Sequence, residues 1–250
     1  LKNYFKGFTN LKNLYLHGFD ISNVNTTAST DNMFNLPKIE KLCMKKDFLT
    51  SNISNLKQMF KYFANSSANR PILNLEGWDV SNVTSMEEMF YQTKFSRLEL
   101  NDWQAEKVTT TKQMFYASEI ENIFLKKWEV PELRDVRSMF IYVEALHVHL
   151  EGWKNTGNMG RLANGNKDFN LFRDIFRFQK VGDNGKDEGW DVNLYLSGDG
   201  WDDDKSGSVI APFEIETDDS TKTYFQKHNV HKAFRGSESD ASVGEMKDIG

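Results

Sequence analysis

Cysteine and long apolar runs are nearly absent from this chain of 250 residues. Cys43 is the single cysteine, which excludes an intrachain disulfide and a cysteine-rich zinc site. No stretch approaches the roughly 20 consecutive apolar residues that span a bilayer, so we expect no membrane insertion by this fragment. The sequence opens at Leu1 in the middle of a repeat pattern, and we expect any export signal or anchor to lie outside it.

An excess of positive charge and the usual catalytic signatures are missing as well. The net charge of −5 argues against nucleic acid and anionic membranes as partners, because both need concentrated positive charge. The five histidines accompany no nucleophile motif such as G-x-S-x-G, and no glycine-rich phosphate loop occurs. We therefore expect a protein that is not an enzyme and that uses no cofactor.

Aromatic residues, in contrast, are abundant, at 13% of the chain, and many recur at a fixed spacing. Met-Phe pairs stand at Met33-Phe34, Met59-Phe60, Met89-Phe90, Met114-Phe115 and Met139-Phe140. A second series, in phase with the first, consists of Phe19, Phe48, Trp78, Trp103, Trp128 and Trp153. Most steps are 25 residues long, and repetition at such a period is the signature of a solenoid.

The clearest copy of the repeat, residues 73–90, changes its apolar period along its length. Leu73 and Leu75 alternate with polar residues, which is typical of a half-buried strand. Comparable pairs recur in the other copies, and stacked coils would place these strands parallel, about 4.8 Å apart. The first part of each coil therefore predicts a short parallel strand.

The last part of the same copy has the spacing of a helical turn. Met86, Met89 and Phe90 stand at i, i+3 and i+4, and Ser85 with Glu88 has the form of a capping box. The pattern predicts an α/β solenoid of the leucine-rich-repeat kind, with right-handed coils of about 25 residues that each contain a short strand and a short helix. We expect six or seven coils and a C-terminal cap.

The regularity of the repeat divides the chain into three segments. Residues 1–153 are regular solenoid repeats, and residues 154–213 are degenerate repeats with an insertion. Trp201 and Phe213 return to the repeat spacing near the end of that second segment. Residues 214–250 are interpreted as a C-terminal cap followed by a polar tail.

Residues 77–90, Gly-Trp-Asp-Val-Ser-Asn-Val-Thr-Ser-Met-Glu-Glu-Met-Phe, resemble a known repeat. The sequence is similar to the BspA-like leucine-rich-repeat bacterial surface proteins, of the W-D-x-S-N-V-x-x-M-x-x-M-F type. The resemblance implies an extracellular, cell-surface solenoid used in adhesion or protein binding, and it supplies no catalytic residue. Gln104 and Glu129 replace the consensus Asp in two coils, so a ligand of the consensus array need not carry over.

The outward face of the predicted strands is the candidate ligand-binding site, because residues between the buried positions point outward. The candidate residues are Tyr15, Ile72, Arg97, Glu99, Phe124, His147 and His149. The alternative is a solvated face that tolerates single apolar residues. His147 and His149 have a spacing compatible with a metal, but a third ligand is not indicated, so we interpret them as an exposed surface pair.

Two acidic runs have a structural interpretation beside a functional one. Asp202, Asp204 and Ser206 resemble the start of a calcium loop, but Phe213 occupies the position of its bidentate acid, so this metal site is a weak candidate. The recurrent Asp-x-Ser-Asn run could form a carboxylate row for metal or sugar, but we favour side chains that close turns locally.

We therefore expect a non-catalytic extracellular surface module that binds a protein or glycan of a host or neighbouring cell through its strand face. One alternative is a passive stalk that spaces another domain from a cell surface. A less favoured alternative is a carbohydrate-active enzyme on a parallel β-helix, which would need a cluster of acids on one face. Glu99 stands alone in its column, which argues against that enzyme.

Overall fold

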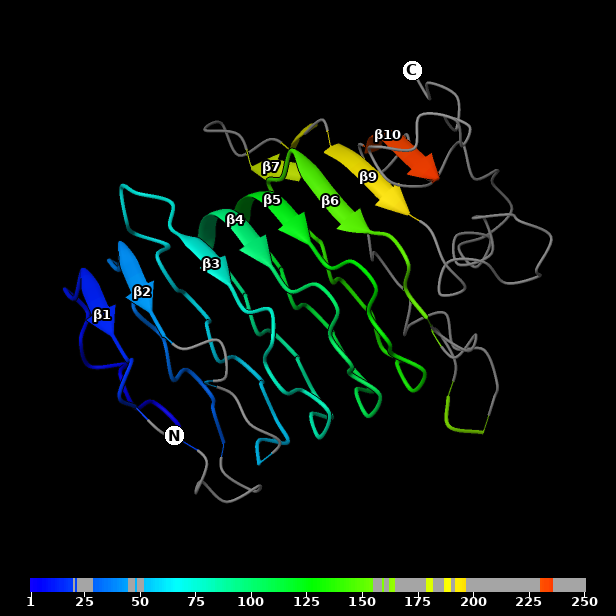
Figure 1. Ribbon diagram of the computed structural model, residues 1–250. Coiled ribbons are helices and arrows are strands. Elements are labelled where there is room, and N and C mark those ends of the chain that lie inside the picture. Colours follow the sequence, from blue (N-terminus) through cyan, green and yellow to red (C-terminus); the bar gives the residue numbers. More distant parts are fainter. Residues whose placement is uncertain are drawn as a thin grey trace.

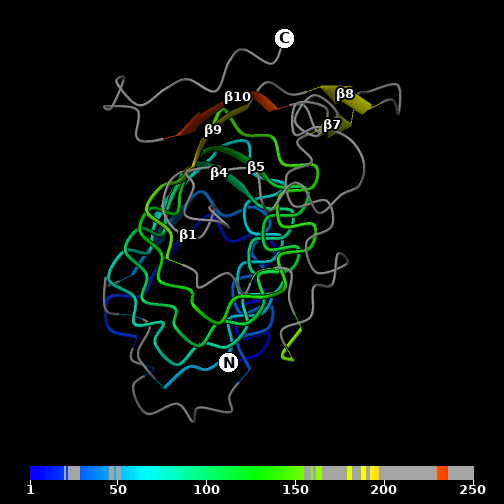
Figure 2. The same cartoon turned by 90° about the vertical axis from the view of Figure 1, so that its right-hand side faces the viewer.

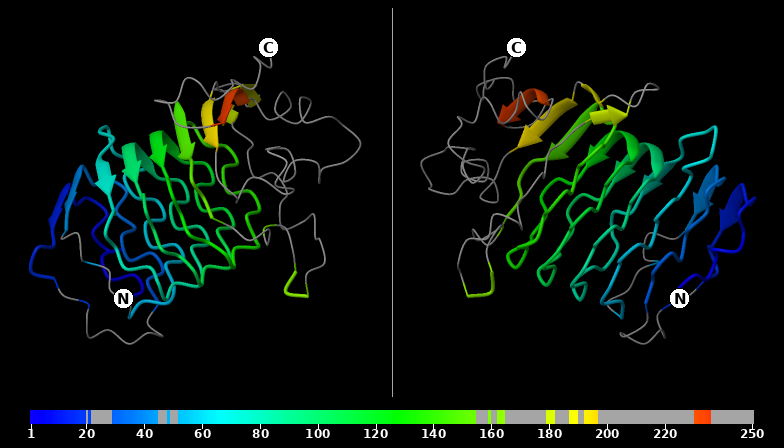
Figure 3. Two further views of the ribbon diagram at one scale, coloured as in Figure 1. Left: turned by 45° about the vertical axis from the view of Figure 1, so that its right-hand side comes forward. Right: turned by 180° about the vertical axis from the view of Figure 1, so that it is seen from behind.

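The computed structural model describes residues 1–19, 21, 29–44, 48, 52–154, 159, 162–164, 179–181, 187–189, 192–196 and 230–235. The chain forms a parallel-stranded β-solenoid of about 5 turns in this part, with one short strand in each coil (Figure 1). Each coil is named here by the strand that it contains. Figure 3 shows the same stack from two further sides, with β1 at one end and β9 and β10 at the other.

The strands are short and most pair in parallel. They are β1 (Asn13–Tyr15), β2 (Lys41–Cys43), β3 (Ile72–Asn74), β4 (Lys94–Glu99), β5 (Glu119–Phe124), β6 (His147–Leu150), β7 (Gln179–Val181), β8 (Asp187–Gly189), β9 (Val192–Leu196) and β10 (Val230–Arg235). Strands β3, β4, β5, β6, β9 and β10 form one parallel sheet in that order. Strands β1 and β2 form a separate parallel pair, and β7 and β8 an antiparallel one.

The predicted strand registers are confirmed by the pairing of the inward residues. Leu73, Leu98, Ile123 and Val148 are direct partners across β3 to β6, and all four are buried. Leu194 on β9 continues the column opposite Val148 and is also buried. The predicted segment boundaries beyond residue 154 fall mostly outside the described residues and stay predictions.

The predicted helices are not present in the described part of the chain, so the α/β assignment is not confirmed there. The Met86–Met89 segment is a turn, in which the Met89 N–H donates to the Met86 carbonyl at 3.2 Å and Glu88 has φ 55°. A residue with a left-handed backbone at the third position of the turn, here Glu88, interrupts a helix but is compatible with a β-turn. Such a turn also brings its first and fourth residues to one side, so Met86 and Met89 are both buried.

The same turn geometry recurs in every regular coil. Asn32, Gln58, Glu88, Gln113 and Ser138 occupy the equivalent position with positive φ. The Ser85 hydroxyl accepts a hydrogen bond from the Glu87 N–H, two residues on, at 3.3 Å, but the left-handed φ of Glu88 means that it closes a turn and does not cap a helix. The short-range pattern that indicated a helix is therefore a stack of turns.

Neighbouring coils satisfy the backbone groups that a helix would have satisfied internally. The Glu88 N–H donates to the Lys112 carbonyl at 3.0 Å, and the Phe90 N–H donates to the Met114 carbonyl at 2.8 Å. Buried backbone donors need such partners. A turn of this kind is therefore stable only when the next coil lies beside it.

Two ladders of aromatic rings fill the core, as the sequence predicts. Phe34, Phe60, Phe90, Phe115 and Phe140 stack with centroid separations of 5.0 to 5.5 Å. Trp78, Trp103, Trp128 and Trp153 stack at 5.2 to 6.5 Å. In Figure 2, a view turned by 90° from Figure 1, the coils overlap as a ring of backbone.

Candidate functional site

The outward strand face is arranged in the columns that the sequence predicts. One column contains Ile72, Arg97, Asn122 and His147, and the next contains Asn74, Glu99, Phe124 and His149. The second column continues to Tyr195 on β9. The structure thus brings five predicted site residues into one patch: Arg97, Glu99, Phe124, His147 and His149. Ile72 borders this patch on β3.

Tyr15, the remaining predicted site residue, is not part of that patch. It lies on β1, in the separate sheet, opposite Cys43 of β2. Its side chain is 59% exposed, and the Lys41 ammonium lies 5.7 Å from its ring centroid. Cys43 and Asn74 stand between Tyr15 and the patch in the alignment of the coils, so one small ligand would not contact both.

Phe124 is the central side chain of the patch, and both faces of its ring are occupied. The Arg97 guanidinium lies 4.0 Å from the ring centroid. The His149 ring stacks at 4.6 Å with an interplanar angle of 7°. Because Arg97 comes from β4 and His149 from β6, they reach Phe124 from opposite sides. The ring is therefore not an open platform for stacking a ligand.

The histidine pair differs from the exposed pair that the sequence predicts. The His149 side chain is only 2% exposed, and its Nδ1 lies 3.0 Å from Glu151 Oε1. Lys126 Nζ lies 3.3 Å from the same oxygen. His147 is half-buried, with its ring centroid 6.3 Å from that of His149. The expectation of an exposed pair is wrong for His149, because stacking on Phe124 and pairing with Glu151 bury it.

Ion pairs cover much of the remaining strand face. Arg70, from the loop before β3, reaches across to Glu119 on β5 at 3.0 Å. Lys94 on β4 pairs with the same carboxylate at 2.9 Å. Glu99 accepts hydrogen bonds from Arg97 and from Asn74. Among these groups Ile72 stands out, because its side chain is 65% exposed.

The described ranges form neither a metal site nor a membrane-spanning helix. Those residues contain no group of three or more His, Cys, Asp or Glu side chains placed to hold a metal ion. Asp202, Asp204 and Ser206 lie outside the described residues, so the weak calcium candidate stays a prediction. No helix long and apolar enough to cross a membrane occurs in the described part.

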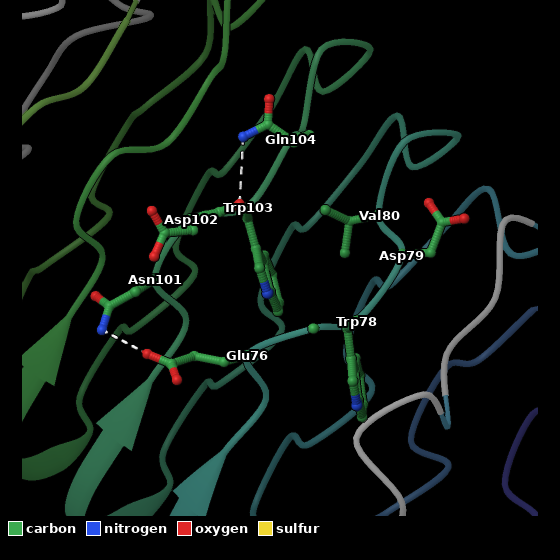
Figure 4. A pocket seen from close by; sticks show the side chains of 9 residues that line it. Glu76, Trp78, Asp79, Val80, Asn101, Asp102, Trp103 and Gln104 are labelled. Carbon is green, nitrogen blue, oxygen red and sulfur yellow. Dashed lines mark hydrogen bonds between the residues drawn. The ribbon is translucent and has the colours of Figure 1, made fainter.

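A surface depression of about 350 Å³ lies between the β3 and β4 coils, where the chain leaves each strand (Figure 4). Its polar side chains already have partners. Asn101 Nδ2 donates to Glu76 Oε1 at 2.8 Å, and Asp79 Oδ1 accepts from the Ser81 N–H at 3.1 Å. The carboxylates of Asp79 and Asp102 point away from each other in Figure 4. At Asp79, the predicted turn-closing role of the Asp-x-Ser-Asn run is confirmed.

A row of tyrosines on the turn side of the coils was missed by the sequence reasoning. Tyr62, Tyr91, Tyr116 and Tyr142 come from the β2, β3, β4 and β5 coils and contact one another in that order. We call them the tyrosine ladder. The signal was present, because a tyrosine stands one or two residues after the Phe of four consecutive Met-Phe pairs.

Charged groups beside the tyrosine ladder are paired between coils. Lys57 and Lys112 lie 2.8 and 3.4 Å from the two oxygens of Glu87. Burial alone would raise the pKa of Glu87, but the hydrogen bond from Lys57 and the charges of both lysines outweigh it and lower that pKa. Burial, with smaller contributions from Tyr116, Tyr62 and Glu88, raises the pKa of Tyr91.

The geometry defines a class of protein, the parallel β-solenoid built from repeats of about 25 residues. Comparison with family models then places the chain in a family. The model described as "Mycoplasma protein of unknown function, DUF285" matches residues 1–122 and again residues 55–176. The chain belongs to this repeat family. No curated protein and no solved structure matches this chain.

Proposed function

We propose that this chain is a non-catalytic, extracellular surface module that binds a protein or glycan of a host or neighbouring cell through its strand face. The observation that carries the proposal is the edge of the patch at Arg97, where Ile72 borders it. There a 65% exposed isoleucine adjoins a half-exposed arginine on a rigid parallel sheet. Exposed apolar and arginine side chains are typical of contact surfaces.

The extracellular location and the adhesive role rest on the resemblance of residues 77–90 to BspA-like surface repeats. Membership of a repeat family of unknown function is compatible with that resemblance. Fold analogy alone does not specify a ligand. The proposal is therefore tested by substitutions in the patch.

A passive spacer is the second candidate function, and the stack around Phe124 favours it. Arg97 and His149 occupy both faces of that ring, and ion pairs join β3, β4 and β5 across the face. Interactions of this kind stabilise a sheet without any ligand. An enzyme is disfavoured, because Glu99 is engaged by Arg97 and Asn74 rather than by a second acid.

The test is binding of the purified chain to arrays of matrix proteins and glycans, in parallel with two variants. Ile72→Ser alters the patch, and Tyr15→Ser removes a similarly exposed side chain from the separate β1–β2 sheet. We expect wild type and Tyr15→Ser to bind one ligand, and Ile72→Ser to lose at least tenfold in affinity. Absence of any ligand for folded wild type would support the spacer instead.

A further inference from the structure

The tyrosine ladder follows the solenoid axis at the spacing of the coils. The Tyr62 N–H donates to the Tyr91 carbonyl at 3.0 Å, and the Gln92 N–H donates to the Tyr116 carbonyl at 2.9 Å. These coil-to-coil bonds follow coils about 4.8 Å apart, and the ring centroids of successive tyrosines lie 6.0, 5.0 and 5.6 Å apart. The ladder therefore presents a phenol once in each of four successive coils, over about 14 Å.

The orientation of the rings differs between the middle and the ends of the ladder. Tyr91 and Tyr116 are parallel, with centroids 5.0 Å apart and an interplanar angle of 8°. Tyr62 is turned by 84° from Tyr91, and Tyr142 by 88° from Tyr116. The middle rings are stacked on each other along the axis, so the faces that they share are closed to a ligand. All four side chains are half-buried.

Amide and carboxylate groups accompany the ladder. Gln58 Nε2 donates to Glu88 Oε2 at 2.9 Å, and Lys61 binds the same carboxylate oxygen. The Lys61 ammonium also lies 4.2 Å from the Tyr91 centroid, which places this polar row directly beside the ladder. The Lys61 and Glu88 charges offset each other, as do those of Lys57 and Glu87.

We propose that the tyrosine ladder binds a linear, uncharged polysaccharide that runs parallel to the solenoid axis. A row of phenols repeated once in each coil, with ring centroids 5.0 to 6.0 Å apart, suits a polymer whose own hydroxyls recur along its length. Phenol and amide groups both donate and accept hydrogen bonds, as sugar hydroxyls require. Paired charges favour an uncharged chain over an anionic or cationic one.

This site is separate from the strand face. The ladder tyrosines belong to the turns that precede the strands, and neither Ile72 nor Phe124 is among their ring partners. The two surfaces can therefore be tested independently. A negative result for one surface does not contradict the proposal for the other.

The experiment is isothermal titration of the full chain with β-linked glucose and N-acetylglucosamine oligosaccharides of increasing length. We expect affinity to rise with length up to the span of the ladder. We expect the double variant Tyr91→Ser/Tyr116→Ser to lose at least tenfold in affinity, and Tyr15→Ser, in the separate β1–β2 sheet, to bind as wild type. Because the serine variant removes half-buried rings, Tyr91→Phe/Tyr116→Phe is measured as well; it keeps the rings and should lose about tenfold through its missing hydrogen bonds.

Four outcomes would overturn the proposal. The first is that wild type binds no uncharged oligosaccharide at millimolar concentration, and the second is that the ladder variants bind as tightly as wild type. The third is that a sulfated oligosaccharide binds more tightly than an uncharged one. The fourth is that the folded Phe variant loses binding to a protein ligand and keeps binding to the glycan. The last result would make the ladder a protein interface. Far-UV circular dichroism and thermal denaturation, which do not depend on the tyrosine signal that the variants remove, establish that each variant keeps its fold.

Discussion

Residues at the same position of successive coils do not all have the same hydrogen bonds. The indole N–H groups of Trp103, Trp128 and Trp153 each donate to the carbonyl of a leucine in the preceding coil, at 3.1, 2.5 and 2.5 Å. The Trp78 N–H is buried, and it has no acceptor within the described part of the chain. An unpaired buried donor costs free energy. The tryptophan ladder is therefore weakest at its first indole.

Replacement of single tryptophans by phenylalanine tests this difference. Trp103→Phe removes a buried hydrogen bond, whereas Trp78→Phe removes a donor that has no acceptor in the described ranges, and both lose a similar ring area. We expect Trp103→Phe to reduce the free energy of unfolding by about 1 kcal/mol more than Trp78→Phe. Urea denaturation measures both values. An equal loss in the two variants would show that the indole hydrogen bond contributes nothing.

Several turn residues other than glycine have left-handed backbone conformations. Asp102 and Lys127 have φ 59° and 56° at the position where the β3 and β6 coils have Gly77 and Gly152. A side chain at such a position costs about 1–2 kcal/mol relative to glycine, partly offset by the larger entropy of glycine in the unfolded chain. The repeat therefore tolerates strain at this turn in some coils.

Relief of that strain is the second prediction. Lys127 is exposed, and its ion pair with Asp102 is long and solvated, so its side chain contributes little. We expect Lys127→Gly to raise the free energy of unfolding by about 0.5 kcal/mol. Glu106→Gly, at an exposed position without positive φ, is the matched control and should lower it. Thermal denaturation that showed both variants destabilised would contradict the assignment of strain.

At the scale of the element, the turn in each coil depends on the neighbouring coils for its backbone bonds and for its ion pairs. Glu87 receives Lys57 from the preceding coil and Lys112 from the following one. The hydrogen bond to Glu87 raises the pKa of Lys57, against the opposing effect of burial. The three side chains thus connect three coils along the outside of the turns.

The pH dependence of stability follows from these pKa shifts. A carboxyl with a lowered folded pKa stabilises the fold above its ordinary value of 4.5, and this contribution is lost as pH falls through the folded pKa. Lys57, whose pKa is raised in the fold, stabilises the folded state below its ordinary pKa of 10.5. That contribution is lost as the pH rises through the folded pKa. We expect urea midpoints to fall on acidification below about pH 4.5, and to fall less in Glu87→Gln. Identical acid profiles for the two proteins would exclude Glu87 as a contributor.

At the scale of the whole molecule, the parallel sheet of the described residues is interrupted between the β2 and β3 coils. Strands β1 and β2 pair only with each other in the described part of the chain, and the six-stranded sheet begins at β3. The Trp78 indole, which has no acceptor among the described residues, lies at the same boundary. The turns still connect across it, since the Phe60 N–H donates to the Met89 carbonyl at 3.0 Å. In a solenoid each coil contacts only its neighbours, so a weak interface limits cooperativity.

Hydrogen exchange measures the strength of this boundary directly. We expect amides of the β1 and β2 coils to exchange through an opening of lower free energy than those of the β4 and β5 coils. Mass spectrometry of peptides from residues 29–44 and residues 111–125 compares the two regions. Uniform protection would show that the turn bonds alone transmit full cooperativity across the boundary.

The sequence by itself determined the repeat, the aromatic ladders and the strand registers. Stacking in a solenoid places residues one repeat period apart in direct contact. The contact between Phe90 and Phe115 could therefore be predicted from their separation of 25 residues in the sequence. The columns that contain Arg97, Phe124 and His147 follow from the same rule. The tyrosine ladder was equally accessible, because its members follow the Met-Phe pairs at nearly the same interval.

Only the tertiary structure decided between helix and turn. Spacing of i, i+3 and i+4 places Met86, Met89 and Phe90 on one side in both conformations, and the difference lies in where their N–H groups donate. Here the acceptors belong to the next coil, as Met114 does for Phe90, and no local pattern contains that information. The burial of His149 is of the same kind, because Phe124 and Glu151 cover it only after the strands have paired.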